Sequence, residues 1–316
     1  MRAGREVVIV DAVRTAVGRG HPTKGVFRDT HPNDLLAPCL RAIVERSGIS
    51  PERIDDVITG CVIPYGEQSV NPGRNAWLQA GLPDSVPATT VDRQCGSGQQ
   101  AVGFAAAMIA CGMADVVVAG GVEHMGRLGF PAENAVTEQY GTPWASTLGD
   151  HPVSQGVCAE RVADQWGIGR LELDELSLRS HRLAAEATTA GRLAQEIVAA
   201  DGVDGPVTVD QGIRPGTTME ALGQLEPAFQ EGGQVTAGNS SQISDGAAAL
   251  MLCAADEAAR LGLTPRAVVV DHLVVGVDPV LMLTGPAPAT ETLLERNGLT
   301  IGDIGRFEVN EAFAAV

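Results

Sequence analysis

The stretch Ala88–Gly112, ATTVDRQCGSGQQAVGFAAAMIACG, predicts a short strand, a tight turn and a long apolar helix. Cys95 lies in the turn, directly before Gly96 and Gly98. A thiol at the start of a helix meets the positive end of the helix dipole and unpaired backbone amides, which stabilise the thiolate. The two glycines allow a sharp turn and leave no side chain that blocks the sulfur. These features predict a nucleophilic cysteine.

Two other interpretations of this stretch stay open on the pattern alone. Gly96-Ser97-Gly98 with Ala101 fits the G-x-G-x-x-A fingerprint of dinucleotide-binding folds, and Glu123 follows at a suitable spacing. Against it, this unit is not the first strand–turn–helix of the chain, and a cysteine before the glycines has no role in binding a nucleotide. Alternatively, Cys95 is a buried structural residue, as cysteines usually are. The other cysteines lie within apolar helix or strand patterns and are predicted to be core residues: Cys39, Cys61, Cys111, Cys158 and Cys253.

On both sides of this stretch, β-branched runs alternate with amphipathic segments. The predicted strands are Val7–Val13, Asp56–Val62, Ala88–Val91, Asp115–Ala119, Ala267–Val275 and Phe307–Val309. The predicted helices are Asn33–Ser47, Gly73–Gln79, Ser97–Gly112, Leu173–Ala190, Asp245–Leu261 and Ala289–Asn297. This alternation favours an α/β fold with a parallel or mixed sheet covered on both faces. The strand signal fades between residues 126 and 236, which predicts a helix-and-loop insertion.

Composition limits the class of protein. A chain of 316 residues suggests two domains, and its 44% apolar and 19% charged residues are ordinary for a globular protein. No apolar run approaches the ~18 residues of a membrane helix. The apolar run Val7–Val10 ends at Asp11, so it predicts a first strand and not a secretory signal.

Charge and cysteine usage limit the partners and the compartment. The net charge of −17 argues against nucleic acid or an anionic membrane as the main partner, so any anionic ligand needs a local basic site. The six cysteines are scattered, without a C-x-x-C pair or a His/Cys cluster at metal-ligand spacing. This pattern predicts a reducing compartment, no disulfide scaffold and no metal site.

The chain also contains an internal repeat. Residues 44–58, VERSGISPERIDDVI, match residues 294–308, LERNGLTIGDIGRFE, at a constant offset of 250. Each copy predicts a helix that ends at a glycine, a short connector and a strand. Such units are common, so coincidence is the alternative explanation. The first copy is followed by a further helix and strands and the second by only eight residues, so we expect the second half to be incomplete in this chain.

Eight motifs, spread in order along the chain, carry a resemblance to a known family. They are VDAVRTAVGR from Val10, NPGRNAWLQAGLP from Asn71, VDRQCGSGQQA from Val91, AGGVEHMGR from Ala119, IRPGTTMEAL from Ile213, VTAGNSSQISDGAAAL from Val235, VDPVLMLTGP from Val277 and NEAFAA from Asn310. Over residues 7–316 the chain resembles the thiolases, the acyl-CoA C-acyltransferases. The resemblance implies two βαβαβαββ halves in five layers, with a loop domain inserted in the first half. The implied segments are an N-terminal half (1–125), the insertion (126–236), the completion of the first half (237–266) and the start of the second half (267–316).

The resemblance also implies roles for individual residues. Cys95 falls where thiolases accept the acyl group as a thioester, and Asn310 matches an asparagine that holds a water in an oxyanion hole. Arg214 matches a residue at the nucleotide end of CoA, and Ser241 one at its pantetheine arm. The apolar tunnel walls align with Phe229, Ala237, Met282 and Phe313. From the residues alone, Arg214 is equally a surface arginine, Ser241 a cap of the predicted helix Asp245–Leu261, and Asn310 a turn residue.

The histidines receive no catalytic role from this comparison. His124 follows a predicted strand near the Cys95 unit, but its neighbour Glu123 belongs to a family stretch that is structural, so we do not expect His124 to be the base. The others lie in predicted loops or on polar helix faces: His21, His31, His151, His181 and His272.

The implied activity is transfer of an acyl group through a cysteine thioester, in thiolysis of a 3-ketoacyl-CoA or in Claisen condensation of acyl-CoA. CoA and acyl-CoA would be substrates, with no bound cofactor or metal, in a cytoplasmic homodimer or homotetramer of lipid metabolism. Ser154 and Gln155 stand where short-chain acetoacetyl-CoA thiolases tend to carry His and Met, which argues against strict acetoacetyl-CoA specificity.

One departure from the family concerns the C-terminal side. Thiolases have a G-H-P motif there, whose histidine activates the nucleophile, and a C-x-G motif with a second cysteine, but this chain ends before either position. One hypothesis is a longer thiolase that lacks its last roughly 70 residues here; it is favoured because a half-built sheet exposes apolar surface. The alternative is a truncated, inactive CoA-binding or scaffold protein.

Overall fold

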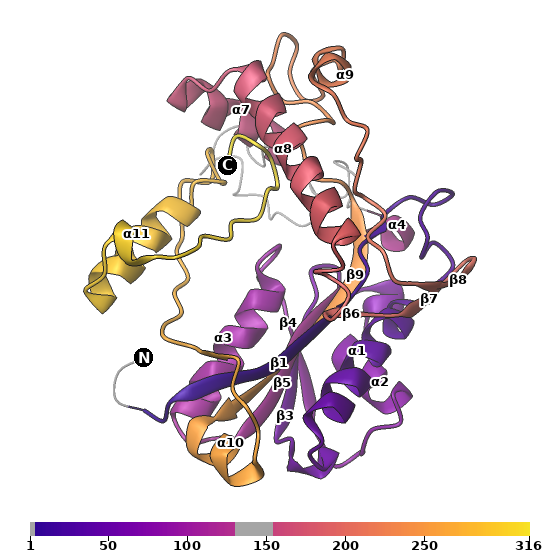
Figure 1. Cartoon of the computed structure of the whole chain (residues 1–316), viewed down its shortest axis with the longest axis vertical. Coiled ribbons are helices and arrows are strands. Elements are labelled where there is room, and N and C mark those ends of the chain that lie inside the picture. Colours follow the sequence, from indigo (N-terminus) through magenta and orange to yellow (C-terminus); the bar gives the residue numbers. More distant parts are fainter. Residues whose placement is uncertain (1–3, 130–153) are drawn as a thin grey trace, which may run out of the picture. The chain divides into compact units, whose positions relative to one another are not determined.

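The computed structural model describes residues 4–129 and 154–316 (Figure 1). Part of the predicted insertion, including His151, lies outside the described residues. The chain forms two compact units. Unit 1 comprises Met1–Phe130, Ala190–Gly212 and Ile243–His272. Unit 2 comprises Pro131–Thr189, Ile213–Gln242 and Leu273–Val316.

A mixed sheet forms the centre of unit 1, which confirms the predicted α/β class. Its strand order is β10-β1-β9-β5-β3-β4. These strands are β1 (Val7–Thr15), β3 (Asp56–Gly60), β4 (Ala88–Val91), β5 (Val116–His124), β9 (Ser244–Ala254) and β10 (Ala267–Val268). β3 is parallel to β4 and to β5, whereas β9 is antiparallel to both β5 and β1. The short strands β2 (Gly18–Arg19) and β6 (Ile197–Val198) pair with β9 and β1, and β7 (Ala200–Gly202) forms a hairpin with β8 (Gly205–Val207).

Helices cover both faces of this sheet (Figure 1). The helices of unit 1 are α1 (Pro32–Ser47), α2 (Pro72–Gln79), α3 (Ser97–Ala110), α4 (Met125–Leu128) and α10 (Ala255–Leu261). Leu40 of α1 and Trp77 of α2 pack on the face that includes Val118. Ala105 of α3 packs on the opposite face, where the side chain of the preceding residue, Val117, lies. Successive side chains of β5 therefore pack in two separate cores, because side chains alternate between the two faces of a strand.

The two copies of the repeat share a helix, a glycine cap and a turn of 3-10 helix, but not the strand that was predicted to follow. α1 ends at Gly48 and α11 (Pro286–Asn297) ends at Gly298, with φ of 70° and 64°, and each glycine N–H donates to carbonyls of the preceding turn. A turn of 3-10 helix follows each cap, at Pro51–Arg53 and at Ile301–Asp303. The left-handed conformation at these positions favours glycine, because glycine has no Cβ that would clash with the backbone there. The predicted helix and cap of both copies are confirmed.

The strand predicted for the second copy, Phe307–Val309, is wrong. These residues are extended without ladder hydrogen bonds, and Phe307 and Val309 are 48% and 42% exposed. A strand needs a hydrogen-bonded neighbour, and the described part of the chain provides none here. Similarly, the predicted strand Ala267–Val275 shortens to β10, because its antiparallel partner β1 begins at Val7 and the pairing ends with Val269 N–H donating to the Val7 carbonyl.

The helix predicted over Asp245–Leu261 is also largely wrong. Residues Ser244–Ala254 form β9, and only Ala255–Leu261 are helical, as α10. β9 lies between β1 and β5 and alternates buried and half-buried side chains along most of its length. Alanine and leucine favour helices locally, but pairing on both edges of this strand overrides that preference.

Helices dominate the described part of unit 2. They are α7 (Gln155–Trp166), α8 (Arg170–Thr189), α9 (Met219–Gly223) and α11. Leu173 of α8 packs with Val235, Phe313 and residues of α7 in one small core. None of the described helices is long and apolar enough to cross a membrane.

Candidate active site

Cys95 lies in a turn that hydrogen bonds hold between β4 and α3. Gln94 has a left-handed φ of 48°, and its N–H donates to Asp92 Oδ1 at 2.7 Å. Ser97 Oγ accepts the Arg93 N–H at 2.8 Å and donates to the Gln94 carbonyl at 2.5 Å. Cys95 itself is exposed. The interpretation of Cys95 as a buried structural residue is therefore wrong. Cys95 precedes α3, so its side chain is not part of the face of α3 that packs on the sheet.

The turn rests directly on the carboxyl end of β3. A Cβ on Gly60, the last residue of that strand, would lie 2.3 Å from the Ser97 carbonyl carbon and 2.4 Å from the Gly98 nitrogen. A Cβ on Gly121 of β5 would lie 3.0 Å from the Gly60 oxygen and 3.6 Å from the Gly98 Cα. Glycines thus let the first turn of α3 approach the strands closely. The carboxyl ends of parallel strands are where α/β sheets bind ligands.

The remaining thiols differ in exposure. Cys111 is exposed, so its prediction as a core residue is wrong; it follows the last turn of α3 as the C-cap, where side chains leave the packed face. Cys39, Cys61, Cys158 and Cys253 are buried, as predicted. Burial is the largest cause that raises the pKa of Cys39, Cys61 and Cys253 to about 12, and it also raises the pKa of Cys158.

Native alkylation tests this division of the thiols. At about pH 8, iodoacetamide is expected to modify Cys95 and Cys111 only, because a buried thiol with a raised pKa stays protonated and unreactive. Peptide mass mapping reads the result, and the denatured protein, which exposes all six thiols, serves as the control. Rapid labelling of Cys39, or an unlabelled Cys95, would contradict the prediction.

His124 is fully buried and contacts the core. Its Nε2 lies 2.8 Å from the Phe27 carbonyl, and its Nδ1 lies 3.2 Å from Asp245 Oδ1. Burial lowers the pKa of His124, but the hydrogen bond to Asp245 and that carboxylate's charge outweigh it and raise the pKa. Its neighbour Glu123 accepts the Val62 N–H and the Gln68 amide, both at 2.7 Å. Both side chains have structural partners, as expected.

A Gly-His-Pro tripeptide also occurs in unit 1, at Gly20-His21-Pro22, far along the chain from the C-terminal position of the family's motif. Nδ1 of His21 accepts the N–H groups of Thr23 and Lys24 at 3.1 and 3.2 Å. These bonds close a local turn, so the described contacts of His21 are those of a capping side chain.

The other predicted site residues lie in unit 2. The rings of Phe229 and Phe313 meet edge to face, with centroids 5.8 Å apart. A Cβ on Gly156 would lie 2.1 Å from the Phe229 ring, so a larger residue there would require the ring to move. Ala237, Met282 and Asn310 are exposed, and Met282 has a left-handed φ of 45°.

Two segments of unit 2 that carry predicted site residues lie side by side. The Ser241 N–H donates to the Ala312 carbonyl at 2.8 Å, and the Ala314 N–H donates to the Asn239 carbonyl at 2.9 Å. The segment 235–241, which contains Ser241, is thereby joined to the segment that contains Asn310. The interpretation of Ser241 as a helix cap is wrong, because the strand β9 follows it.

A buried polar network that no sequence motif indicated holds the segment 235–241. The Asn239 side chain donates to Asp174 Oδ1 at 3.0 Å, and Asp174 pairs with Arg170 at 2.7 Å. Glu160, which is also buried, accepts the N–H groups of Gln234 and Val235 at 2.8 and 2.9 Å. The only sequence signal was the i, i+4 spacing of Arg170 and Asp174, which is common on helices.

Arg214 is exposed and has an unexpected neighbour. Its backbone N–H donates to Nδ1 of His181, a half-buried residue of α8, at 3.3 Å. The preceding residue, Ser180, donates from its hydroxyl to Glu311 Oε2 at 2.5 Å. Two consecutive residues of α8 therefore contact the Arg214 segment and the Asn310 segment.

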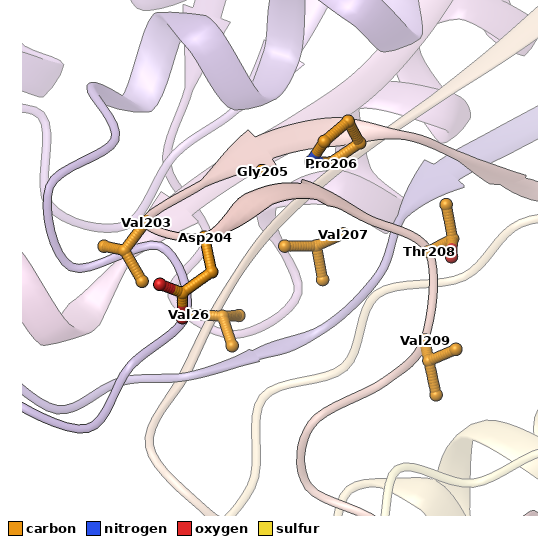
Figure 2. A pocket seen from close by; sticks show the side chains of 8 residues that line it. All are labelled: Val26, Val203, Asp204, Gly205, Pro206, Val207, Thr208 and Val209. Atoms are coloured by element: carbon orange, nitrogen blue, oxygen red, sulfur yellow. The ribbon is translucent and has the colours of Figure 1, made fainter.

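Two pockets of the described residues lie elsewhere. Valine side chains of the β7–β8 hairpin and Val26 line a cavity of about 280 Å³ (Figure 2). A second cavity, of about 350 Å³, lies beside α3 and includes Gln99, Gly103 and His272. Neither is lined by a predicted site residue. The described residues contain no cluster of three or more His, Cys, Asp or Glu side chains suited to a metal ion.

An exposed thiol before a helix that covers an α/β sheet is the arrangement of enzymes with a cysteine nucleophile. Family models agree with this class: "Thiolase, N-terminal domain" matches residues 7–256, and "Thiolase, C-terminal domain" matches residues 263–316. The chain belongs to the thiolase family.

Curated relatives support this membership over nearly the whole chain. The chain is 43% identical to the steroid 3-ketoacyl-CoA thiolase FadA6 of Mycobacterium tuberculosis, over 98% of this chain and 77% of the relative. It is 46% identical to the 3-ketoacyl-CoA thiolase of Saccharophagus degradans, over 98% of this chain and 80% of the relative.

Solved structures confirm the predicted thiolase fold. The crystal structure of the Bacillus anthracis acetyl-CoA acetyltransferase matches with a TM-score of 0.89 and 38% identity, covering 100% of this chain and 82% of that one. The human mitochondrial 3-ketoacyl-CoA thiolase in complex with CoA matches with a TM-score of 0.88 and 33% identity, covering 98% of this chain and 80% of that one.

Proposed function

We propose that this chain is an acyl-CoA C-acyltransferase that carries the acyl group on Cys95. The observation that carries the proposal is the exposed Cys95 thiol at the N-terminus of α3, at the end of β3, in a chain of the thiolase family. From an acyl-CoA, the sulfur attacks the thioester carbonyl carbon, the bond from that carbon to the CoA sulfur breaks, and CoA leaves and takes up a proton. From a 3-ketoacyl-CoA, the sulfur attacks the 3-keto carbon, the bond between C2 and C3 breaks, and C2 takes up a proton as acetyl-CoA leaves. A second substrate then accepts the acyl group from the Cys95 thioester.

Backbone amides of the turn and Asn310 supply the electrostatic help. Each attack places negative charge on the carbonyl oxygen, and preorganised N–H donors stabilise such an oxyanion. The N–H groups of the first turn of a helix have no partners within the helix and suit this role. Asn310 is exposed, so its side chain is accessible to hold the water of the second oxyanion site.

The proposed CoA site combines a cation with apolar walls. Arg214 is exposed and binds the nucleotide end, which a chain of net charge −17 must attract locally. Ser241 contacts the pantetheine arm, and its segment is fixed by the backbone hydrogen bond to Ala312. The tunnel walls are Phe229, Ala237, Met282 and Phe313, of which the two rings already contact each other.

We propose a 3-ketoacyl-CoA as the acyl donor, without strict specificity for acetoacetyl-CoA, in line with the 3-ketoacyl-CoA thiolases that the chain resembles. Ser154 is the N-cap of α7 and Gln155 its first residue, in place of the His and Met of short-chain thiolases. The segments 1–125, 126–236, 237–266 and 267–316 remain our proposal for the domain organisation. Cysteines without a disulfide support a cytoplasmic location, and the family resemblance supports a homodimer or homotetramer.

Acyl transfer onto Cys95 tests the function directly. After incubation of the full-length protein with acetyl-CoA or acetoacetyl-CoA, the peptide that contains Cys95 is expected to carry one acetyl group. The peptide with Cys111, the other exposed thiol, is the internal control and stays unmodified. An unmodified Cys95 in protein that binds CoA would overturn the enzymatic function and favour the CoA-binding scaffold instead.

A further inference from the structure

The proposed nucleotide end of the CoA site contains a second polar side chain beside Arg214. We propose that His181 is a phosphate-binding residue of this site: its Nδ1 fixes the Arg214 backbone, and its Nε2–H donates to a phosphate oxygen of CoA. The inference rests on the proposed function, which places Arg214 at the nucleotide end. No motif in the sequence pointed to His181.

The hydrogen bond from Arg214 determines which ring nitrogen of His181 is the donor. The Arg214 N–H donates to Nδ1 at 3.3 Å, and a ring nitrogen that accepts a hydrogen bond carries no proton. The neutral imidazole must then carry its proton on Nε2. No residue in the ranges 4–129 and 154–316 accepts a hydrogen bond from that Nε2. It is therefore a donor that is available to a ligand.

Charges around His181 favour this neutral donor. Burial and then the positive charge of Arg214 lower the pKa of His181, against the smaller opposite effect of Glu311. Glu220 lies on α9, which packs against α8, and on α8 itself Arg182 pairs with Glu186 at 2.7 Å. A neutral imidazole at neutral pH keeps Nδ1 free to hold the Arg214 segment while Nε2–H meets the anion.

The position of His181 on α8 makes it a rigid donor. Its neighbour Ser180 donates to Glu311, the residue after Asn310, so the same helical turn is tied to a second site segment. On the other side, the Thr217 N–H donates to the Arg214 carbonyl at 3.1 Å, which fixes the turn that begins at Arg214. Donors held in place lose little entropy when a phosphate binds.

Side-chain replacements separate the two roles of the imidazole. Asparagine places an acceptor near Nδ1 but no donor near Nε2, glutamine places an amide donor near Nε2, and phenylalanine supplies neither. Binding of CoA, 3′-dephospho-CoA and pantetheine is measured by calorimetry. His181→Phe is expected to weaken CoA binding about tenfold and pantetheine binding less than about twofold, because a hydrogen bond to a charged group is lost. Each of His181→Asn and His181→Gln is expected to restore part of the CoA affinity.

Controls keep the result interpretable. Arg182→Gln removes an exposed charge next to His181 and is expected to leave CoA affinity within about twofold. Thermal unfolding verifies that His181→Phe remains folded. If the loss disappears with 3′-dephospho-CoA, the contact is to the 3′-phosphate; if it persists, the contact is to the diphosphate, and both outcomes support the proposal.

Equal weakening of CoA and pantetheine by His181→Phe, or no weakening, would overturn the inference. Arg214→Ala separates this failure from failure of the proposed function. If Arg214→Ala weakens CoA binding selectively and His181→Phe does not, only the role of His181 is wrong. If the unmodified protein does not bind CoA, or Arg214→Ala weakens both ligands equally, the proposed nucleotide end itself is wrong.

Discussion

Replacing Cys95 with serine is expected to lower the rate of acyl transfer at least about 10³-fold, because a hydroxyl cannot replace the thiolate as the group that carries the acyl chain. Stability should change by less than about 0.5 kcal/mol, since the exposed side chain of Cys95 contributes little packing. CoA affinity should remain within about twofold, because the nucleophile contributes chiefly to the transition state. Steady-state kinetics, calorimetry and thermal unfolding of one preparation supply the three values.

Cys111→Ser is the matched control for this change. Cys111 is the other exposed thiol and lies at the opposite end of α3, so the variant alters a similar side chain on the same helix. It is expected to keep its activity within about twofold. If Cys95→Ser retained a tenth of the activity, or Cys111→Ser lost it, the assignment of the nucleophile would be wrong.

Gly60→Ala is expected to destabilise the protein by about 2–4 kcal/mol, because the new methyl group would overlap backbone atoms of Ser97 and Gly98. Relief of that overlap requires the first turn of α3 to move away from β3, and Cys95 would move with it. A displacement of this kind should also lower the rate of acyl transfer, by about 10²-fold. Urea unfolding gives the change in stability, and the acetylation of Cys95 gives the change in rate.

Gly98→Ala provides the contrast to this overlap. A Cβ on Gly98 would meet only the Gly120 oxygen, at 3.9 Å, which is an ordinary contact. Because alanine favours helices over glycine, this variant is expected to gain about 0.5–1 kcal/mol of stability. The close approach of β3 to the turn is refuted if Gly60→Ala unfolds at the same urea concentration as the unmodified protein.

Elements set by local signals were predictable from the sequence. The strand β4 has the predicted ends, and α1, α2 and α11 differ from prediction by three residues or fewer, because prolines near their starts and glycines after α1 and α11 mark their limits. In contrast, β9 reads as a helix, since Ala-rich sequences favour helices and only its pairing with β1 and β5 makes it a strand. Phe307–Val309 shows the reverse, with strand-forming residues but no described neighbour to pair with.

The site likewise contains residues that local sequence signals indicate and residues whose contacts are distant along the chain. The exposed position of Cys95 in a turn was predictable because a thiol, two glycines and an apolar helix are consecutive in the chain. Asp174 and His181 were not, because their roles come from residues that lie 65 and 33 positions away, Asn239 and Arg214. Cys111 was assigned to the core because hydrophobic periodicity does not distinguish the last residue of a helix from its cap.

The place of β9 in the sheet has a consequence for synthesis. This strand separates β1 from β5, and it is encoded after both of them and after most of unit 2. On the ribosome, the nascent β1 and β5 must wait for residue 254 before either gains its central partner. Contacts so distant along the chain form slowly, and until they form, β1 and β5 each have an unpaired edge that can pair with another chain.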